Sequence, residues 1–324
     1  MTDPVVVVTG AGSGVGAATA IELSRRGARV VLAGRRADAL EAVARECRRA
    51  TPALAVPTDV TDAAAVQRLG AEAARHFGRV DGWVNNAGVT TYGRFAEVPA
   101  AEFARVLEVN VLGVAHGMRT ALAHFRRTGR GVLVNNASVL GVVAAPYQSA
   151  YSAAKHAVRA LGASVRQELR LAGERGIAVC TVLPYSMDTP LFAHAGNHTG
   201  RAPRPVPPVY PAWAAARTVA ELLHRPRREV YAGGAGRLSG LSVRLAPGLS
   251  ERLVGTFAGR TTLGGAGAPV GPGNLFDDSD DDARIPGGFH GLAHRAFRRS
   301  ATWGLAAGTA AVLARRALAR QAGG

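Results

Sequence analysis

One stretch decides the fold of this chain: Val5-Val6-Val7-Val8-Thr9-Gly10-Ala11-Gly12-Ser13-Gly14-Val15-Gly16. The valine run is typical of a strand that is buried on both faces. The glycines that follow predict a tight turn, and an amphipathic helix is expected from there to Gly27. A second strand is expected over residues 28–33. This unit of strand, turn, helix and strand is about 30 residues long, which is the size of a βαβ unit.

The glycine turn has a chemical meaning when it lies between a strand and a helix. Glycine lets the backbone approach a pyrophosphate closely, and the N-terminus of the helix supplies oriented N–H groups and the positive end of a dipole. Glycine clusters are common in turns, so the cluster alone is weak evidence. In this context it predicts a dinucleotide-binding site.

Strands and helices continue to alternate after this unit. Helices are expected at 37–50, 61–77, 100–127, 149–173 and 213–224, and strands at 54–57, 80–84, 131–136, 177–183 and 229–232. This alternation predicts an α/β fold, a doubly wound parallel sheet of the Rossmann type, in one domain over residues 1–235. Ligands bind beyond the carboxyl ends of the strands in such sheets. Polar or helix-breaking residues follow four of the strand ends, at Thr9, Asn85, Ser138 and Pro184.

Lys155 is the only lysine in the sequence. Lysine and arginine together number 39, so the other 38 are arginines. The lysine comes four residues after Tyr151, so the two would share a helix face. A compact ammonium that can lose its proton has a role beside a phenol that arginine cannot take. The alternative is that one lysine survived by chance on a surface helix. The pattern favours a functional pair of Tyr151 and Lys155.

Several motifs together resemble those of the compact, single-domain short-chain dehydrogenases/reductases. They are Thr9-Gly10-x-x-x-Gly14-x-Gly16, Asp59-Val60, Asn85-Asn86-Ala87-Gly88, Asn110, Ser138 and Tyr151-x-x-x-Lys155, and they occur in the order of that family. The separation of 13 residues between Ser138 and Tyr151 is also usual there. The resemblance covers about residues 4–232.

The resemblance implies an oxidoreductase that transfers a hydride between a nicotinamide and an alcohol or ketone. It assigns Tyr151 as the general acid or base, and a neighbouring ammonium would lower its pKa from about 10. It assigns Lys155 to that task and to the nicotinamide ribose, and Ser138 to the substrate oxygen. Asn110 would maintain a water-linked proton path to Lys155. Each residue alone also has a structural interpretation, such as packing, a strand end or local hydrogen bonding.

The resemblance also assigns a set of cofactor-binding residues: Thr9, Gly10, Ser13, Gly14, Val15, Gly16, Asp59, Val60, Asn86, Ala87, Gly88, Tyr151, Lys155, Pro184 and Thr189. At the end of the second strand, NAD-preferring dehydrogenases usually carry a carboxylate, and this chain has Arg35 and Arg36. An arginine fork suits a 2′-phosphate. NADP is therefore the expected cofactor, with Arg35 as the first candidate for the phosphate. NAD stays an alternative, because Ser13 is not basic and both arginines could simply begin a solvated helix.

Tyr185 departs from the family pattern, which commonly has a glycine after the position of Pro184. Its ring would either narrow the pocket near the nicotinamide or reshape the turn. The segment 191–208 that follows is expected to be a polar lid that sets substrate choice. His194 and His198 in this lid are four residues apart, but no cysteine or carboxylate accompanies them, so no metal site is predicted.

Charge and cysteine content limit the other classes of function. The formal net charge of +16 favours an acidic partner, such as a nucleotide phosphate, nucleic acid or an anionic membrane. The arginines are scattered along helices rather than grouped with aromatic residues, so a nucleic-acid partner is not expected. Cys47 and Cys180 have neither disulfide nor metal spacing. The N-terminus leads directly into the first strand, so we expect no signal peptide and a cytoplasmic protein.

The pattern changes after residue 235. Residues 236–258 predict short amphipathic helices, and residues 259–291 predict a flexible linker rich in Gly, Pro and Asp. Residues 292–324 predict a basic helix, whose uncharged centre is shorter than the ~20 residues that span a bilayer. This helix could lie on an anionic membrane, pack on a partner subunit or have no stable structure. A homo-oligomer is implied by the resemblance alone.

Two hypotheses follow for the function. The first is an NADP-dependent oxidoreductase that acts on a small-molecule alcohol or carbonyl compound, with Tyr151 as the general acid or base. The second is a cofactor-binding sensor or scaffold that its C-terminal helix tethers to a membrane or a partner. The complete set of Asn110, Ser138, Tyr151 and Lys155 favours the enzyme, because a sensor needs no tyrosine acid.

Overall fold

A computed structural model describes residues 3–277 and 283–289 of the chain. Within these residues a central sheet of seven parallel strands has the order β12-β7-β6-β4-β1-β2-β3. The strands are β1 (Val5–Thr9), β2 (Arg29–Gly34), β3 (Ala53–Pro57), β4 (Gly82–Asn85), β6 (Gly131–Asn136), β7 (Ile177–Pro184) and β12 (Glu229–Ala232). The strand order reverses between β1 and β4, which is the switch point where such sheets bind ligands. The predicted doubly wound fold is confirmed.

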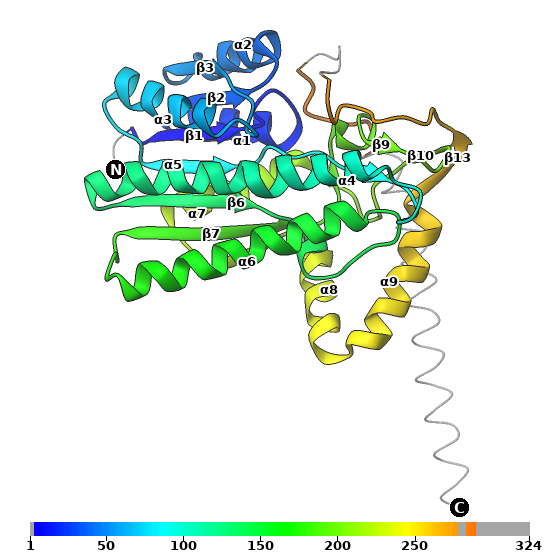
Figure 1. Ribbon diagram of the computed structural model, residues 1–324. Helices are drawn as coiled ribbons and strands as arrows, with labels where there is room; N and C mark the ends of the chain where they lie inside the picture. Colours follow the sequence, from blue (N-terminus) through cyan, green and yellow to red (C-terminus); the bar gives the residue numbers. More distant parts are fainter. Residues whose placement is uncertain (1–2, 278–282, 290–324) are drawn as a thin grey trace, which may run out of the picture.

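Helices cover both faces of the sheet (Figure 1). On one face α1 contacts α2 and α7, and on the other α3 contacts α5 and α4 contacts α6. The helices are α1 (Gly14–Arg25), α2 (Ala37–Cys47), α3 (Ala63–Phe77), α4 (Ala100–Leu107), α5 (Gly113–Thr128), α6 (Ser149–Leu171) and α7 (Ala212–His224). A short π-helix, η1 (Glu108–Leu112), joins α4 to α5 inside the range predicted as helix 100–127.

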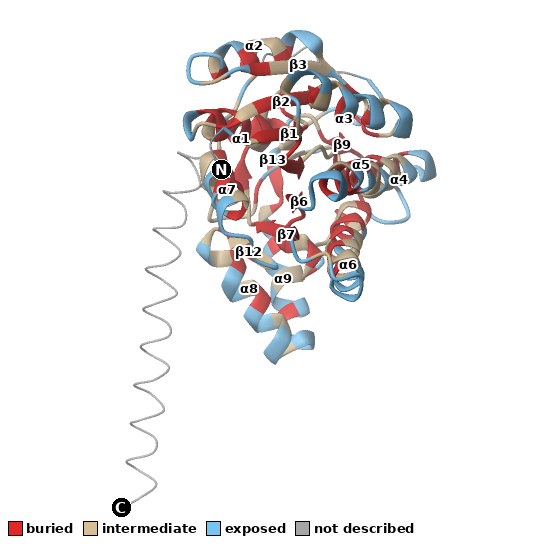
Figure 2. Ribbon diagram, turned by 90° about the vertical axis from the view of Figure 1, so that its left-hand side faces the viewer, coloured by how far each residue is buried: buried red, intermediate tan, exposed pale blue. Residues whose placement is uncertain are grey.

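The valine run of β1 shows why these residues form a central strand. Val5 and Val7 belong to the core cluster on one face of the sheet, and Val6 and Val8 belong to the cluster on the other. Successive side chains of a strand point to opposite faces, so both faces of β1 need apolar residues. All four valines are buried, and Figure 2 shows the buried residues concentrated in the sheet and on the helix sides that face it.

The segment after the sheet begins with two helices, α8 (Gly234–Leu245) and α9 (Pro247–Thr261). They agree with the short helices predicted for residues 236–258. In Figure 2 they project from the edge of the domain on the side of β12, which α8 contacts. A short strand, β13 (Leu263–Gly267), follows α9.

The prediction of a flexible linker from residue 259 is corrected by this strand. β13 pairs antiparallel with β10 (Arg201–Pro203) of the lid, and the Arg201 guanidinium donates to the carbonyl oxygens of Leu263 and Gly264. These bonds use backbone atoms, so a glycine-rich composition does not reveal them. The predicted basic helix at 292–324 and residues 278–282 of the predicted linker lie outside the described residues. No helix within residues 3–277 and 283–289 is both long and apolar enough to cross a membrane.

Candidate active site

A cavity of about 500 Å³ opens at the carboxyl ends of the strands. Most of the predicted site residues line it: Gly10, Ser13, Gly14, Val15, Asn86, Ala87, Gly88, Ser138, Tyr151, Lys155, Pro184 and Thr189. The other predicted residues are not part of its wall. Three of them contact the turns that form the wall: Thr9, Gly16 and Asn110. The other four follow the ends of β2 and β3: Arg35, Arg36, Asp59 and Val60.

Tyr151 and Lys155 lie in the first turns of α6, one turn apart as predicted. The Lys155 Nζ is 5.3 Å from the centre of the Tyr151 ring and donates to the backbone oxygen of Asn136 at 2.9 Å. Lys155 is only 4% exposed. Burial disfavours its charged form and lowers the pKa of the ammonium to about 8. The structure therefore makes this lysine able to lose its proton near neutral pH.

Burial also acts on the tyrosine and raises the pKa of Tyr151 to about 12. A hydrogen bond with the Ser138 hydroxyl opposes this rise. Ser138 lies two residues after the end of β6 and caps a short 3₁₀ turn, where its Oγ accepts a hydrogen bond from the Leu140 N–H at 3.1 Å. The strand end thus orients the serine toward the tyrosine, and the phenol is protonated at neutral pH.

Asn110 lies in the π-helix η1 and is fully buried. Its side-chain amide makes two bonds with the backbone of Val89, accepting from the N–H at 2.9 Å and donating to the oxygen at 2.8 Å. A Cβ on Gly88 would lie 3.1 Å from Asn110 Oδ1 and 3.7 Å from Lys155 Nζ. The asparagine and the lysine therefore approach the same glycine from two elements. The proton path predicted for Asn110 stays a prediction.

The glycine turn is shaped by close contacts between backbone segments. Gly10 has a φ of +64°, and a Cβ on it would lie 2.7 Å from Ala87 Cα. A Cβ on Gly16 would lie 1.9 Å from the Gly10 oxygen. Thr9 Oγ1 accepts from the N–H groups of Asn86 and Ala87 at 3.0 and 3.2 Å. These contacts join the turn after β1 to the turn after β4 and bring both to the cavity.

Asn136 is a site residue that the sequence analysis missed. It is the last residue of β6, its backbone oxygen accepts from Lys155, and its Nδ2 donates to Asn86 Oδ1 at 2.8 Å. Its own Oδ1 is buried with no hydrogen-bond partner among the described residues. A buried amide oxygen without a partner is uncommon, and this one lies in the cavity wall. Its place two residues before Ser138 was the one available signal.

Arg35 extends from the end of β2, where the sequence predicts contact with a 2′-phosphate. Its guanidinium donates to the backbone oxygens of Asn274, Phe276 and Asp277 at 3.1, 3.3 and 3.3 Å. Arg36 precedes α2 without capping it through its side chain. The structure therefore places Arg35 at the predicted position and gives it partners from the far end of the chain.

Asp59 and Val60 follow β3, next to an arginine that the sequence analysis did not select. Arg105 on α4 approaches Asp59 Oδ2 to 3.5 Å. Burial would raise the pKa of Asp59, but hydrogen bonds from Thr61 and the charges of Arg105 and Arg35 outweigh it and lower that pKa. The carboxylate is thus ionised and could accept hydrogen bonds from a ligand. Val60 is buried beside it.

Tyr185 is part of the cavity wall, and two contacts hold its side chain in place. Its hydroxyl donates to the Pro207 oxygen at 3.2 Å, and its ring meets that of Tyr210 edge to face with centroids 6.3 Å apart. The ring therefore joins the turn after β7 to the lid at Pro207 while it also lines the cavity. His198 bonds Glu102 Oε2 at 2.8 Å, and His194 lines the cavity. Among the described residues no group of three His, Cys, Asp or Glu side chains could hold a metal ion.

The donor set at this cavity fits a dinucleotide cofactor. The first turn of α1 directs N–H groups at one end of the cavity, where anionic phosphate is favoured. A buried ammonium and a buried amide oxygen without a partner lie further along the wall, at Lys155 and Asn136. Hydroxyl and amide groups of a ribose and a nicotinamide could pair with these two. The arrangement suits a ligand with phosphate at one end and a polar ring at the other.

Comparison with known proteins gives consistent matches. The model of the family described as short chain dehydrogenase matches residues 4–199. An uncharacterised oxidoreductase of Bacillus subtilis (strain 168), YxnA, is 34% identical over 259 residues, covering 78% of this chain and 72% of that protein. Cis-4-hydroxycyclohexanecarboxylate dehydrogenase of Sinomonas cyclohexanicum is 44% identical over 191 residues, covering 58% and 75%. The crystal structure of a short chain dehydrogenase/reductase from Burkholderia phymatum in complex with NAD has a TM-score of 0.68 and 29% identity, covering 75% of this chain and 95% of that chain.

Proposed function

This chain belongs to the short chain dehydrogenase family and is an oxidoreductase, and we propose that it interconverts an apolar ketone and its secondary alcohol with NADP. One observation carries the proposal: Tyr151, Ser138 and Lys155 meet in the wall of a single cavity. Their types and positions match the acid, the oxygen-binding hydroxyl and the buried cation that carbonyl reduction requires.

Reduction of a ketone requires a hydride at the carbonyl carbon and a proton at the oxygen. The reduced nicotinamide supplies the hydride when it is bound. The hydroxyl groups of Ser138 and Tyr151 hold the carbonyl oxygen by donating hydrogen bonds to it. As the carbon–oxygen π bond breaks, the oxygen takes the phenolic proton, which leaves an alcohol and a phenolate. The Lys155 ammonium, 5.3 Å from the ring centre, stabilises that phenolate.

The pKa shifts of this pair suit the reductive direction. Burial raises the pKa of Tyr151 to about 12 and holds the phenol protonated, so the proton donor is ready at neutral pH. Oxidation needs the phenolate first, and the positive charges of Lys155 and of an oxidised nicotinamide favour it. The reaction is therefore reversible in principle, with reduction as the direction for which the free protein is prepared.

Arg35 supports NADP over NAD in this proposal. It stands at the end of β2, and its guanidinium has the planar donor fork that recognises phosphate. The structure from Burkholderia phymatum contains NAD, but it is that of a different protein with 29% sequence identity, so it does not decide the cofactor of this chain. The charge of Arg35 helps to lower the pKa of Asp59, and the Asp59 carboxylate already accepts hydrogen bonds from Thr61 and pairs with Arg105.

The lining of the cavity supports an apolar substrate. Large apolar side chains come from the turn after β6, the lid and α9: Leu140, Val143, Leu191, Phe192, Val206, Leu253, Val254 and Phe257. Gln148, His194 and Arg204 add polar groups at the same wall. A cavity of this kind excludes water around a ring or short chain and orients it with a few polar contacts. Cyclic ketones are therefore the first substrates to test, in line with the cyclic alcohol named for the Sinomonas relative.

The test is turnover by the purified full chain with NADPH and a panel of cyclic and linear ketones. Tyr151→Phe keeps the ring and removes the proton donor, so we expect kcat to fall by about 10²–10⁴. Tyr231→Phe is the matched control, because Tyr231 lies on β12 outside the cavity wall and its loss of a hydroxyl should leave kcat unchanged. Turnover that survives Tyr151→Phe would refute the role of the tyrosine. Tight binding of NADPH without turnover across the panel would favour the sensor hypothesis.

A further inference from the structure

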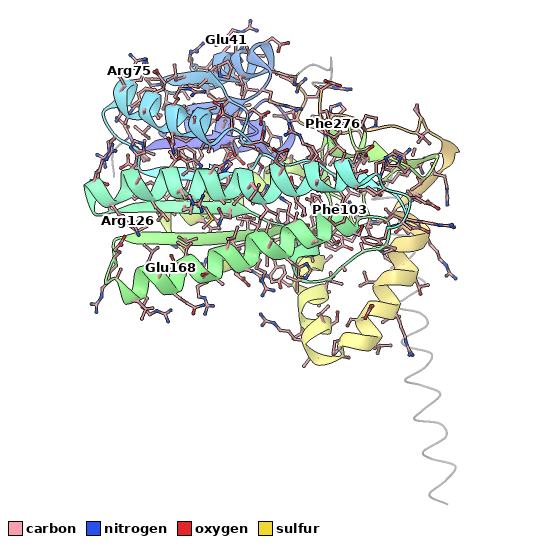
Figure 3. All side chains as sticks on the ribbon, viewed as in Figure 1. Glu41, Arg75, Phe103, Arg126, Glu168 and Phe276 are labelled. Carbon is pink, nitrogen blue, oxygen red and sulfur yellow. The ribbon has the colours of Figure 1, made fainter. Side chains whose placement is uncertain are left out.

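Two described stretches near the C-terminus, residues 272–277 and 283–289, contact the cofactor side of the domain. We call them the strap. In Figure 1 the chain after β13 runs back from the lid toward the N-terminal half of the sheet, and Figure 3 labels Phe276 on this part. The strap begins at the lid, where the Asn274 N–H donates to the His194 oxygen at 2.9 Å. It therefore spans the edge of the sheet where the cofactor is expected to bind.

The first stretch of the strap occupies the surroundings predicted for the adenosine end. Arg35 is held by three backbone oxygens of residues 274–277. Arg105, the neighbour of Asp59, donates to the Leu275 oxygen at 3.0 Å and lies 6.0 Å from the centre of the Phe276 ring. The strap thus takes up the charged groups that would recognise a phosphorylated ribose.

Leu275 adds an apolar contact at the same end. Its side chain is 0% exposed and belongs to the buried cluster that includes Val60, Val89 and Val109. Val60 is one of the predicted cofactor-binding residues. A fully buried leucine stabilises a contact by about 2–3 kcal/mol, so Leu275 is the main apolar anchor of this stretch.

The second stretch lies against the elements predicted for the pyrophosphate. The Arg284 backbone oxygen accepts a hydrogen bond from the Gly14 N–H at 2.9 Å, at the N-terminus of α1. Asp188 Oδ1 accepts from the N–H groups of Gly287 and Phe289 at 2.9 and 2.8 Å. A Cβ on Gly287 would lie 2.2 Å from the Thr189 oxygen. The strap backbone therefore lies in direct contact with Gly14 and Thr189, both predicted cofactor residues.

We propose that the strap is an intramolecular competitor of the cofactor, which must leave the adenosine and pyrophosphate positions before NADP binds. This inference rests on the proposed function, because it assumes that the cofactor binds in the groove that the strap contacts. Backbone carbonyl oxygens, which carry partial negative charge, accept hydrogen bonds from Arg35 and from the Gly14 N–H of α1. The phosphates of NADP carry full charges and bind the same donors more strongly. The apparent Kd then equals the intrinsic Kd divided by the fraction of molecules whose strap is displaced.

Hydrogen–deuterium exchange on the full chain tests the direction of the effect. A competitor is released on binding, so NADPH should speed exchange of the amides of Gly287 and Phe289 and of residues 273–277. A strap that closes over a bound cofactor would be protected instead, and slower exchange on adding NADPH would overturn the inference. Because wild-type protein is used, this result does not depend on the folding of any variant.

Leu275→Ser tests the same idea through affinity. It removes the apolar anchor, and we expect the Kd for NADPH to fall about tenfold as the open fraction rises. Leu245→Ser is the matched control, because Leu245 is a leucine of α8 that is 75% exposed, and its Kd should not change. An unchanged or higher Kd for Leu275→Ser would overturn the inference while NADPH binding itself stands. If neither wild type nor Leu275→Ser binds NADPH or NADH, the proposed function fails, and the inference fails with it.

Discussion

Replacing Lys155 with methionine is expected to stabilise the folded protein while it abolishes turnover. The lysine is buried, and burial lowers its pKa to about 8, against about 10.4 for a free lysine. Each pKa unit corresponds to about 1.4 kcal/mol. The charged lysine therefore costs about 3 kcal/mol of stability at neutral pH.

Methionine removes this cost and fills most of the same volume, but it also removes one hydrogen bond. The Asn136 backbone oxygen loses its donor at 2.9 Å, which costs about 1–2 kcal/mol. The desolvation effect is larger, so we expect a net gain of about 1–2 kcal/mol at pH 7. In a chain of 324 residues each kcal/mol raises Tm by about 2 °C. Loss of the cation beside Tyr151 should lower kcat/KM by about 10²–10⁴.

The pH dependence identifies the cause of the gain. Between pH about 8 and about 10.4 the unfolded chain binds a proton at Lys155 that the folded chain has lost, so wild-type stability rises with pH across this window. The advantage of Lys155→Met should therefore be fully present below pH 8 and disappear above about pH 10.4. Lys155→Arg is the contrast, because it keeps a buried charge that cannot be neutralised and should be less stable than wild type.

Thermal unfolding followed by circular dichroism across this pH range, together with NADPH-linked turnover, measures both effects. A lower Tm for Lys155→Met than for wild type at pH 7 would refute the reasoning, as would a stability difference that does not change between neutral and alkaline pH.

Two further predictions follow from the cofactor side of the domain. Gly16→Ala places a Cβ 1.9 Å from the Gly10 oxygen and should lower the free energy of unfolding by at least about 3 kcal/mol. Gly255→Ala in α9 is the contrast, because the space around this glycine is open, and it should raise the free energy of unfolding by about 0.5–1 kcal/mol. Chemical denaturation of the two variants and the wild type measures both changes. Arg35→Asp should shift the ratio of Kd values from NADP toward NAD by at least about tenfold. The strap competes with both dinucleotides, so its release cancels in this ratio, and an unchanged ratio would remove Arg35 from the phosphate site.

Much of the site was accessible from the sequence because it follows local patterns. A valine run with both faces buried specifies a central strand, and a glycine turn before a helix specifies its phosphate end. The spacing of four residues between Tyr151 and Lys155 specifies a shared helix face. Parallel strands end at a common edge of the sheet, so residues that follow separate strands, such as Gly14 and Ser138, line the same cavity without any further information.

The sequence alone therefore determined the class of sheet, the edge at which ligands bind and the residues that face each other on one helix. The tertiary structure decided the rest: the anchoring of Tyr185 on the lid, the pairing of β13, the role of Asn136 and the capture of Arg35 by residues 274–277. In these cases the partner is mostly a backbone oxygen from a distant segment. Every residue carries that oxygen, so no residue type marks it, and only the path of the folded chain brings it to the side chain.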